Sequence, residues 1–557
     1  MSDVLTRTDS AFIDSVVNDA LGAADRPLGE EAIGGAFDGA RKYDQSLANF
    51  NPPSVSADMS ILHDKEILDS RVEDMLRNDG YIRSARQLHR DNIVGDRYLL
   101  NARPKLAVLG LDEAWGKEFQ LEVESKFGLA AESEDCWFDA AGKMTFTGII
   151  RLVVGIYCAR GEVLGQAKYL RGSRRPFKTA VQMIDLDRLE TPYEHQADKR
   201  VRGGIRHDVN GRPLGAYIRN AHKSDFLMQP EDMDYTFIPA RKPWGRQQLM
   251  YLLDADRPDQ SRGVSEIVAG LKELHITKSF RNVTLQNAVV NATIAASIES
   301  ELPSETVFAQ MGAGRKSKSE GGAVAKYGQD YLGAVAQYSG DKLKIDGAKI
   351  PHLFPGTKLK LHPAGSPGGV GQDFEKGLLR YISALLGVSY EQLSRDYSET
   401  NYSSARAAMN ETWKFMQSRK RMVADRWANM IYALWLEEQI NSGGLETMRG
   451  RSVPNFYDPL MKEAYAHASW IGAGRGEVDP LKERQADVLA VKYRLMTREE
   501  YFAKHGKDYR EEFAQMEREE TELSDRGLTV EESNTINAVS GAPREQENDG
   551  TDSQDGG

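Results

Sequence analysis

The chain has 557 residues, 40% of them apolar and 28% charged, which is typical of a soluble globular protein with about three or four domains. Its net charge of −11 at pH 7 argues against a protein that grips duplex DNA by neutralising phosphates, although an acidic wall suits a conduit that repels DNA. Two cysteines indicate a reducing compartment, and the lack of a long apolar run predicts neither a secretory signal nor a membrane-spanning helix.

The first 60 residues are rich in Gly, Asp, Ser and Asn and predict a weakly ordered arm. Two amphipathic helices are expected next, at 63–78 and 81–94, each with a glycine near its end that favours termination. His89 in the second helix has no further ligand at helical spacing, so we expect a packing or surface residue rather than a metal ligand.

Residues 145–170 predict a buried helix followed by a strand, with Gly161 at the corner between them. Cys158 lies in the apolar part of this segment and is expected to be an unreactive core residue. A basic cluster follows at 171–178. It is compatible with nucleic-acid contact, but a solvated loop is the favoured interpretation.

A β-rich region is expected after this cluster. Asn210-Gly211 lies between two alternating segments of 203–220, which is the strongest short signal for a β-hairpin. Residues 234–253 predict further strands.

A long helix is expected from 265 to 300, with Ser265 as its candidate N-cap. Its apolar residues do not keep to one narrow face, which suits a helix packed against copies of itself in a ring. Lys278 and Arg281 are three residues apart and therefore share a face. Contact with a phosphate backbone and a solvated basic face remain equally open for this pair.

Residues 312–349 are rich in Gly, Lys and Ser, and 343–363 predict short strands with a turn at Asp346-Gly347. The run GAGRKS at 312–317 superficially looks like a phosphate-binding loop. It lacks the spacing of that motif and a strand-to-helix context, so we reject this interpretation.

The stretch 372–413 predicts a helix, a polar loop and a much longer second helix. Gly387 is expected to end the first helix, and Ser403 or Ser404 to cap the second, which runs to about residue 440. The loop, 388–403, is the candidate functional site. Its candidate DNA-contacting residues are Arg395, Asp396, Tyr397, Asn401 and Tyr402, in addition to Lys278 and Arg281.

On this pattern alone an ordinary helical hairpin with a long linker stays open. However, the run LLRYISALLGVSYEQLSRDYS at 378–398, continued by YSSARAAMNETW at 402–413, closely resembles the lambda family of phage portal proteins, also called head–tail connectors. A second stretch, 469–519, resembles the same family. The resemblance covers roughly residues 60–520, whereas both termini are interpreted from composition only.

The resemblance implies an α+β portal fold with a β-containing wing, a two-helix stem, a small β clip and a helical crown, assembled as a homo-oligomeric ring. The implied divisions are an N-terminal arm (1–60), the first part of the wing (61–262), a stem helix (263–302), the clip (303–370), a second stem helix (371–387), the channel loop (388–403), a long wing helix (404–445), the crown (446–523) and a disordered acidic tail (524–557).

The family also implies the function and the partners. About twelve subunits would form a ring at one capsid vertex that passes the genome in both directions. The expected partners are further copies of the chain, the terminase large subunit, a head–tail adaptor, the major capsid or scaffold protein, and double-stranded DNA bound non-specifically; no membrane is expected. The expected location is the virion, and the host cytoplasm during assembly.

Sequence motifs for catalysis, a cofactor or a metal are absent: we find no H-E-x-x-H, no paired C-x-x-C and no G-x-S-x-G. We therefore expect no enzyme activity, no cofactor and no metal site. The alternative from a second class is a head-completion or tail adaptor ring, which is usually shorter and lacks the long wing. A hydrolase is the least favoured class.

Overall fold

The computed structural model describes residues 47, 49–172, 174–225, 229–293, 343–345, 348–350, 370–398, 400–476 and 479–526, which are called the described residues below. The predicted arm and the predicted clip lie largely outside this set, and so does most of the acidic tail. The chain divides into two units, Met1–Ser60 and Ile61–Gly557, and the sheets and the candidate site belong to the second.

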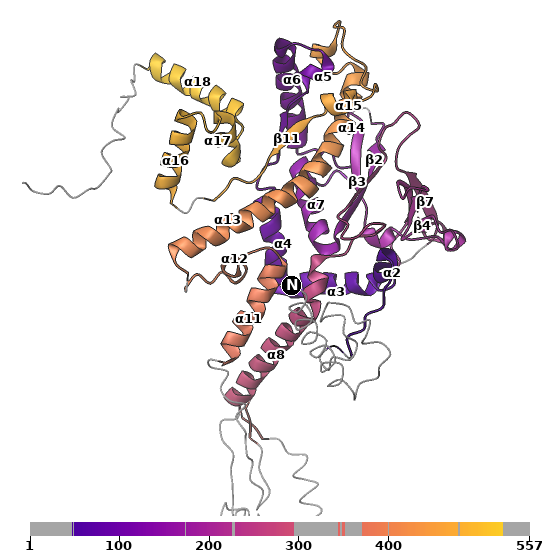
Figure 1. Cartoon of the computed structure of the whole chain (residues 1–557), viewed down its shortest axis with the longest axis vertical. Helices are drawn as coiled ribbons and strands as arrows, with labels where there is room; N and C mark the ends of the chain where they lie inside the picture. Colours follow the sequence, from indigo (N-terminus) through magenta and orange to yellow (C-terminus); the bar gives the residue numbers. More distant parts are fainter. Residues whose placement is uncertain are drawn as a thin grey trace, which may run out of the picture. The chain divides into compact units, whose positions relative to one another are not determined.

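Helices and strands alternate along the chain, with the helices predominating at both ends of the second unit (Figure 1). The α-helices are α2 (Ala57–Leu62), α3 (Lys65–Asn78), α4 (Gly80–Ile93), α5 (Leu106–Leu109), α6 (Glu113–Ala131), α7 (Phe146–Arg160), α8 (Leu271–Thr293), α11 (Val370–Leu385), α12 (Tyr390–Ser394), α13 (Tyr402–Arg419), α14 (Arg426–Ser442), α15 (Met461–Tyr465), α16 (Pro480–Lys492), α17 (Arg498–Lys504) and α18 (Tyr509–Asp525). The strands are β1 (Leu99–Ala102), β2 (Glu162–Tyr169), β3 (Thr179–Met183), β4 (Val201–Arg202), β5 (Ile205–His207), β6 (Pro213–Arg219), β7 (Tyr235–Pro239), β8 (Leu249–Leu253), β9 (Leu343–Ile345), β10 (Ala348–Ile350) and β11 (Ala468–Ile471).

The strands form small antiparallel sheets with the orders β3-β2-β8, β4-β5-β6-β7, β1-β11 and β9-β10. The β5–β6 hairpin confirms the prediction at Asn210-Gly211, and Gly211 has the positive φ of 81° that such a turn requires. The paired strands β9 and β10 agree with the strands predicted within 343–363. Within the described ranges, every helix is too short or too polar to cross a bilayer.

The corner between α7 and β2 is as predicted. Thr145 caps α7, and Gly161 ends it in the left-handed conformation (φ 68°) before β2 begins. A Cβ atom at residue 161 would collide with the backbone of Val264, so the glycine also admits the segment that leads into α8. The described residues of the basic cluster, 171–172 and 174–178, have no regular secondary structure, and Arg175 packs over the Trp137 ring at 5.3 Å.

The main hydrophobic core lies between α6, α7, α14 and β11. It is built around aromatic rings: Phe127 packs edge-on against Phe146 (ring centroids 5.1 Å apart) and Trp435 (5.3 Å), and Phe146 stacks on Trp470 (5.3 Å). A smaller core lies under the β4–β7 sheet. Trp470 and its strand belong to the predicted crown range, but β11 pairs with β1 and lies in the main core.

A network of charged side chains is buried where α3, β2 and the segment 260–265 meet. Glu162, fully buried, lies 2.8 Å from Arg262 and 3.1 Å from Lys65. Lys65 also pairs with Asp69, which pairs in turn with Arg160. Burial alone would raise the pKa of Glu162, but the charges of Arg262 and Lys65, together with hydrogen bonds from Arg262 and Tyr251, lower it to about 2. No pattern in the sequence predicted this network.

The helix predicted from about 404 to 440 is continuous, but it contains a π-helical turn. It consists of α13, the π-helical segment η7 (Lys420–Asp425) and α14, and it ends at Gly443 with φ 68°. The expected N-cap was wrong: Asn401, not Ser403 or Ser404, accepts the cap hydrogen bond, from the backbone N–H of Ser404 at 2.9 Å.

The helix predicted from 265 begins with Ser265 as its N-cap, as expected. Its first turn is the 3₁₀-helix η6 (Glu266–Gly270), which leads into α8.

Candidate functional site

The helices α8 and α11 lie side by side and position the predicted loop (Figure 1). Phe280 and Phe374 contact edge-on with ring centroids 5.7 Å apart, and Arg281 Nε lies 3.1 Å from Glu375 Oε1. The Arg281 guanidinium also lies 4.6 Å from the centre of the Tyr81 ring. Arg281 therefore joins three helices of its own chain.

The C-terminal end of α11 is fixed by α4 and α13. His89 Nε2, on α4, lies 3.0 Å from the Leu386 carbonyl oxygen and hydrogen-bonds to it. Burial lowers the pKa of His89 to about 4, so the ring is neutral near pH 7 and the predicted packing role is confirmed. Gly387 has φ 63°, and the Phe415 ring occupies the space that a side chain would need there.

Arg419, at the end of α13, connects the second flank of the loop to the 3₁₀-helix η6 that precedes α8. Its guanidinium pairs with Glu266 and lies 4.6 Å from the centre of the Phe415 ring. A cavity of about 400 Å³ opens beside this pair, lined among others by Tyr157, Cys158 and Asp254. Burial raises the pKa of the Cys158 thiol to about 11, which keeps it protonated and unreactive near neutral pH, as predicted.

The loop itself is more ordered than a plain polar linker. Ser389 accepts from the backbone N–H of Gln392, and the Gln392 side chain bonds back, which forms a capping box for α12. Arg395 ends this short helix in the left-handed conformation, with φ 58°. The predicted loop 388–403 thus contains a helical turn between residues 390 and 394.

The loop's tip is exposed and hydrogen-bonded locally. Asp396 Oδ1 accepts from the backbone N–H (3.1 Å) and the hydroxyl (2.6 Å) of Ser398, and these bonds lower the pKa of Asp396. Tyr397 is 55% exposed. Within the described part of the chain, no hydrogen bond or ion pair engages the Arg395 guanidinium.

The structure brings five of the seven predicted site residues together. Arg395, Asp396 and Tyr397 follow α12 directly, while Asn401 and Tyr402 begin α13. Lys278 and Arg281 lie on α8, and among the described residues no hydrogen bond or ion pair links either to the loop. The residues that hold the loop's flanks, His89, Phe415 and Arg419, were not predicted as site residues, because only the glycine at 387 carried a local signal.

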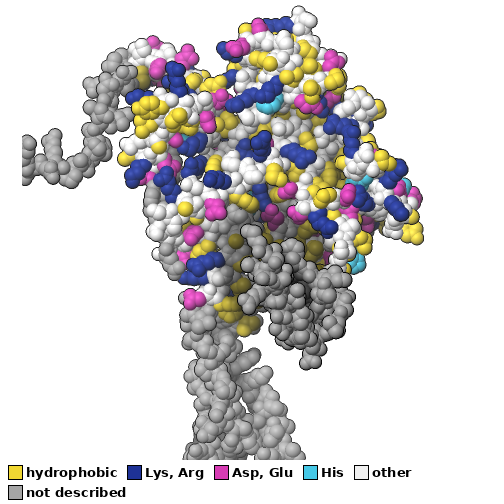
Figure 2. All heavy atoms as spheres, viewed as in Figure 1, with side chains coloured by type: hydrophobic (Ala, Val, Ile, Leu, Met, Phe, Trp, Pro, Cys, Tyr) yellow, Lys and Arg dark blue, Asp and Glu magenta, His cyan; other side chains and the backbone are white. Residues whose placement is uncertain are grey.

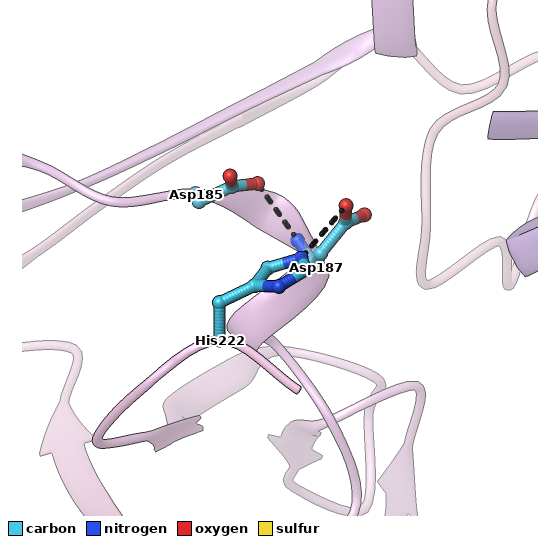
Figure 3. A group of neighbouring side chains, drawn as sticks. All are labelled: Asp185, Asp187 and His222. Atoms are coloured by element: carbon cyan, nitrogen blue, oxygen red, sulfur yellow. Dashed lines mark hydrogen bonds and ion pairs between the residues drawn. The ribbon is translucent and has the colours of Figure 1, made fainter. Parts of the chain in front are cut away.

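One group of possible metal ligands occurs within the described ranges: Asp185, Asp187 and His222, with ligand atoms within 4.8 Å of one another (Figure 3). The group is already satisfied. Arg160 lies 3.0 Å from Asp187, and His222 Nδ1 accepts from the backbone N–H of Ser224, which leaves its Nε2 proton directed at Asp187. An imidazole in this tautomer offers no free lone pair to a metal, so the cluster fits a hydrogen-bonded turn better than a metal centre.

Comparison with known proteins then decides the family. The sequence model of the family described as "Phage portal protein, lambda family" matches residues 43–420. The chain is 35% identical to the portal protein of Escherichia phage N15, covering 89% of this chain and 90% of the relative. It is 34% identical to portal protein B of Escherichia phage lambda, covering 89% and 91%. The chain belongs to the lambda family of phage portal proteins.

This membership confirms the resemblance seen in the sequence and establishes the function as that of a phage portal protein, a structural component of the virion and not an enzyme.

Solved structures of gene transfer agent particles are also similar. One chain of the native virion is 10% identical with a TM-score of 0.36, covering 76% of this chain and 88% of that chain. One chain of the neck with C12 symmetry is 10% identical with a TM-score of 0.34, covering 80% and 97%. TM-scores below 0.5 do not establish a common fold.

Proposed function

We propose that the chain assembles into a closed ring of about twelve copies around a DNA channel, at one vertex of the capsid. Family membership is the first support. The second is the exposure of apolar side chains on α8, where Ile276, Val283 and Leu285 are 45%, 59% and 65% exposed. A helix already packed on α11 that still exposes such residues fits contact with neighbouring copies.

The loop between α11 and α13 is proposed to project into that channel. The observation that carries this proposal is the contrast between the loop's flanks and its tip. His89 and Arg419 hold the flanks, whereas the Arg395 and Tyr397 side chains at the tip are solvent-exposed. A loop whose flanks are fixed and whose tip exposes its side chains to solvent suits a segment that contacts DNA moving through the channel.

In a ring, Arg395 and Asp396 of all copies would form closely spaced circles of opposite charge. Such circles nearly cancel at long range, yet they present donors to phosphates within the ~10 Å screening distance of moderate salt. Tyr397, Asn401 and Tyr402 would add contacts that do not depend on DNA sequence. Weak, sequence-independent contact suits a conduit that must both pass and retain a genome.

Lys278 and Arg281 on α8 are also proposed to face the channel, but fewer observations support this than support the loop. Arg281 already has intramolecular partners in Glu375 and Tyr81, so a role in the wall falls mainly to Lys278. The remaining partners of the proposal are the terminase large subunit and head–tail adaptor at the clip, and the major capsid or scaffold protein. Assembly would take place in the host cytoplasm.

The test of the loop assignment is the double substitution Arg395→Ala with Tyr397→Ala. Ring formation, measured by native mass spectrometry, and the melting temperature should stay unchanged, while DNA packaged or retained per particle falls. The matched control is Arg212→Ala with Tyr193→Ala, which removes an exposed arginine and an exposed tyrosine at positions outside the loop. Normal packaging and retention in the loop variant would remove the loop from the channel.

A further inference from the structure

Helix α16 has its polar and apolar faces reversed relative to an ordinary surface helix. Glu483 and Asp487, four residues apart, are 7% and 8% exposed, and they are its only acidic residues. Leu481, Val488 and Leu489 lie on the opposite face and are 60%, 52% and 52% exposed. A surface helix normally buries the apolar face and exposes the charged one.

The reversed orientation is held by specific ion pairs. Lys504 Nζ lies 2.7 Å from Asp487, and Arg406 Nε lies 3.9 Å from Glu483. Arg406 is on α13 and Lys504 on α17, so two elements fix the charged face inward. The apolar face is therefore presented outward in the same way in every copy of the chain.

The residues after α16 extend this apolar face: Tyr493 is 69% exposed and Leu495 is 81% exposed. Figure 2 shows hydrophobic side chains on the surface at the upper left, where Figure 1 places α16 and α17. The charged side chains exposed on α16 and just after it are all basic: Lys482, which pairs with Asp479 at 3.1 Å, Arg484, Lys492 and Arg494. We call this surface, residues 481–495, the basic apolar face.

Helix α18 carries a second incomplete apolar face with the opposite charge. Phe513 and Met516 are 37% and 43% exposed, and no residue of the helix is buried. Phe513 does contact Phe502 of α17, with ring centroids 5.9 Å apart, so the face is only partly covered within the chain. Seven acidic residues and two arginines lie on α18, and Arg510, one of the two, already pairs with Glu124.

We propose that the basic apolar face of one subunit packs against α18 of the neighbouring subunit. The two surfaces are complementary in hydrophobicity and in charge. Each exposes apolar side chains, and the charged residues beside them are basic on one surface and mainly acidic on the other. Two different, complementary surfaces on one chain make a head-to-tail contact, which closes into a ring when the rotation permits. This inference rests on the proposed ring and specifies one contact within it.

Disulfide cross-linking tests the contact directly. Leu489→Cys and Met516→Cys are introduced together, rings are isolated by size and verified by mass photometry, and diamide is added as oxidant. A head-to-tail contact should give a ladder of covalent multimers on a non-reducing gel, because every subunit carries both cysteines. Each single variant should stay monomeric, as should the unsubstituted chain with Cys136 and Cys158, and an equimolar mixture assembled from the two singles should give dimers.

The outcomes separate this inference from the proposed function. Intact rings without a ladder would overturn the α16–α18 contact and leave the ring standing, whereas the absence of rings would overturn the proposed function itself. Dimers from Leu489→Cys alone would show that α16 pairs with another α16, which also contradicts the proposal.

Charge reversal provides an independent measurement on the same rings. Lys492→Glu with Arg494→Glu should slow cross-linking of the cysteine pair by about fivefold, because two favourable charge contacts become repulsive. Adding Glu517→Lys and Glu519→Lys should restore the rate. The matched control, Arg171→Glu with Arg174→Glu, should leave it unchanged. A restored rate is specific to the proposed partner surfaces, and a failure to restore it would contradict the pairing.

Discussion

The body of the chain, the described part of residues 61–476, and the C-terminal helices α16–α18 are held together by different forces. The body is built around buried rings such as Phe127, Trp427 and Trp435, each 1% exposed or less. The C-terminal helices attach to it through polar contacts: Asn101 donates to Glu499 at 2.7 Å, and Arg510 pairs with Glu124 at 3.2 Å.

This difference indicates that the two regions obtain their stability from different sources. Burial of apolar area is the dominant favourable contribution to folding, and the body has that burial within one chain. The C-terminal helices expose their apolar side chains instead. We propose that their full stabilisation comes from contact with the neighbouring subunit.

Truncating the body core should have the largest effect. Trp427 is fully buried and packs against Gly165, so Trp427→Ala should lower the free energy of unfolding by about 3–5 kcal/mol. The measurement is the midpoint of urea denaturation, followed by tryptophan fluorescence. Trp244→Ala, at a position 58% exposed, is the control and should change the free energy by less than about 0.5 kcal/mol.

The buried ion network should be nearly as sensitive. Glu162→Gln keeps the shape of the side chain but leaves the charges of Arg262 and Lys65 buried without their main partner, at a cost of about 3–5 kcal/mol. The exposed pair between Glu118 and Arg451 provides the contrast. Glu118→Gln should cost no more than about 1 kcal/mol, and equal losses in the two variants would contradict the structural importance of the network.

Acidification should weaken the body through His89. Its pKa of about 4 in the folded chain lies below the value of about 6.5 expected in the unfolded chain, so the unfolded state binds more protons between these pH values. The contribution of the neutral ring is complete above about pH 6.5 and declines by roughly 3 kcal/mol as the pH falls to 4. Unfolding free energies measured from pH 8 to pH 4 should show a smaller slope in His89→Gln, and an unchanged slope would contradict this origin.

The smallest effect is expected on the apolar face of α16. Leu489→Ser should change the unfolding free energy of the dissociated chain by about 0.5 kcal/mol or less, because the side chain is already exposed. The measurement is made at a concentration where mass photometry detects monomers. A loss comparable with that of Trp427→Ala would show that α16 buries this residue within its own chain, and the comparison of the two regions would fail.

The local architecture was largely predictable from the sequence, because helix ends and turns depend on nearby residues. Gly161, Gly387 and Asn210-Gly211 are positions where only a few residue types fit the backbone, and all three were interpreted correctly. The N-cap of α13 was misassigned by two or three residues, since Asn401 takes the place of Ser403 or Ser404. Several residues in NYSS can cap a helix, and local sequence does not distinguish them.

The site was predictable only in part. Arg395, Asp396 and Tyr397 stand out in a polar loop, and the structure places them together at its tip. His89, Arg419 and Glu266 support the loop from elements that are distant along the chain, and no periodicity or motif connects them. The reversed orientation of α16 was equally hidden, since it depends on ion pairs with Arg406 and Lys504.

The π-helical turn η7 has a consequence for insertions and deletions. A π turn accommodates about one residue more than an α turn. Compared with an uninterrupted α-helix of the same number of residues, η7 therefore rotates α13 relative to α14 by roughly 100° about their common axis. The buried face of α14 and the loop-bearing end of α13 are thereby set in angular phase with each other. Loss of one residue between 420 and 425 would convert the π turn into a regular α turn and keep the two faces in phase. Loss of one residue elsewhere in α13 or α14 has no such reserve and would turn the loop away from its supports by roughly 100°.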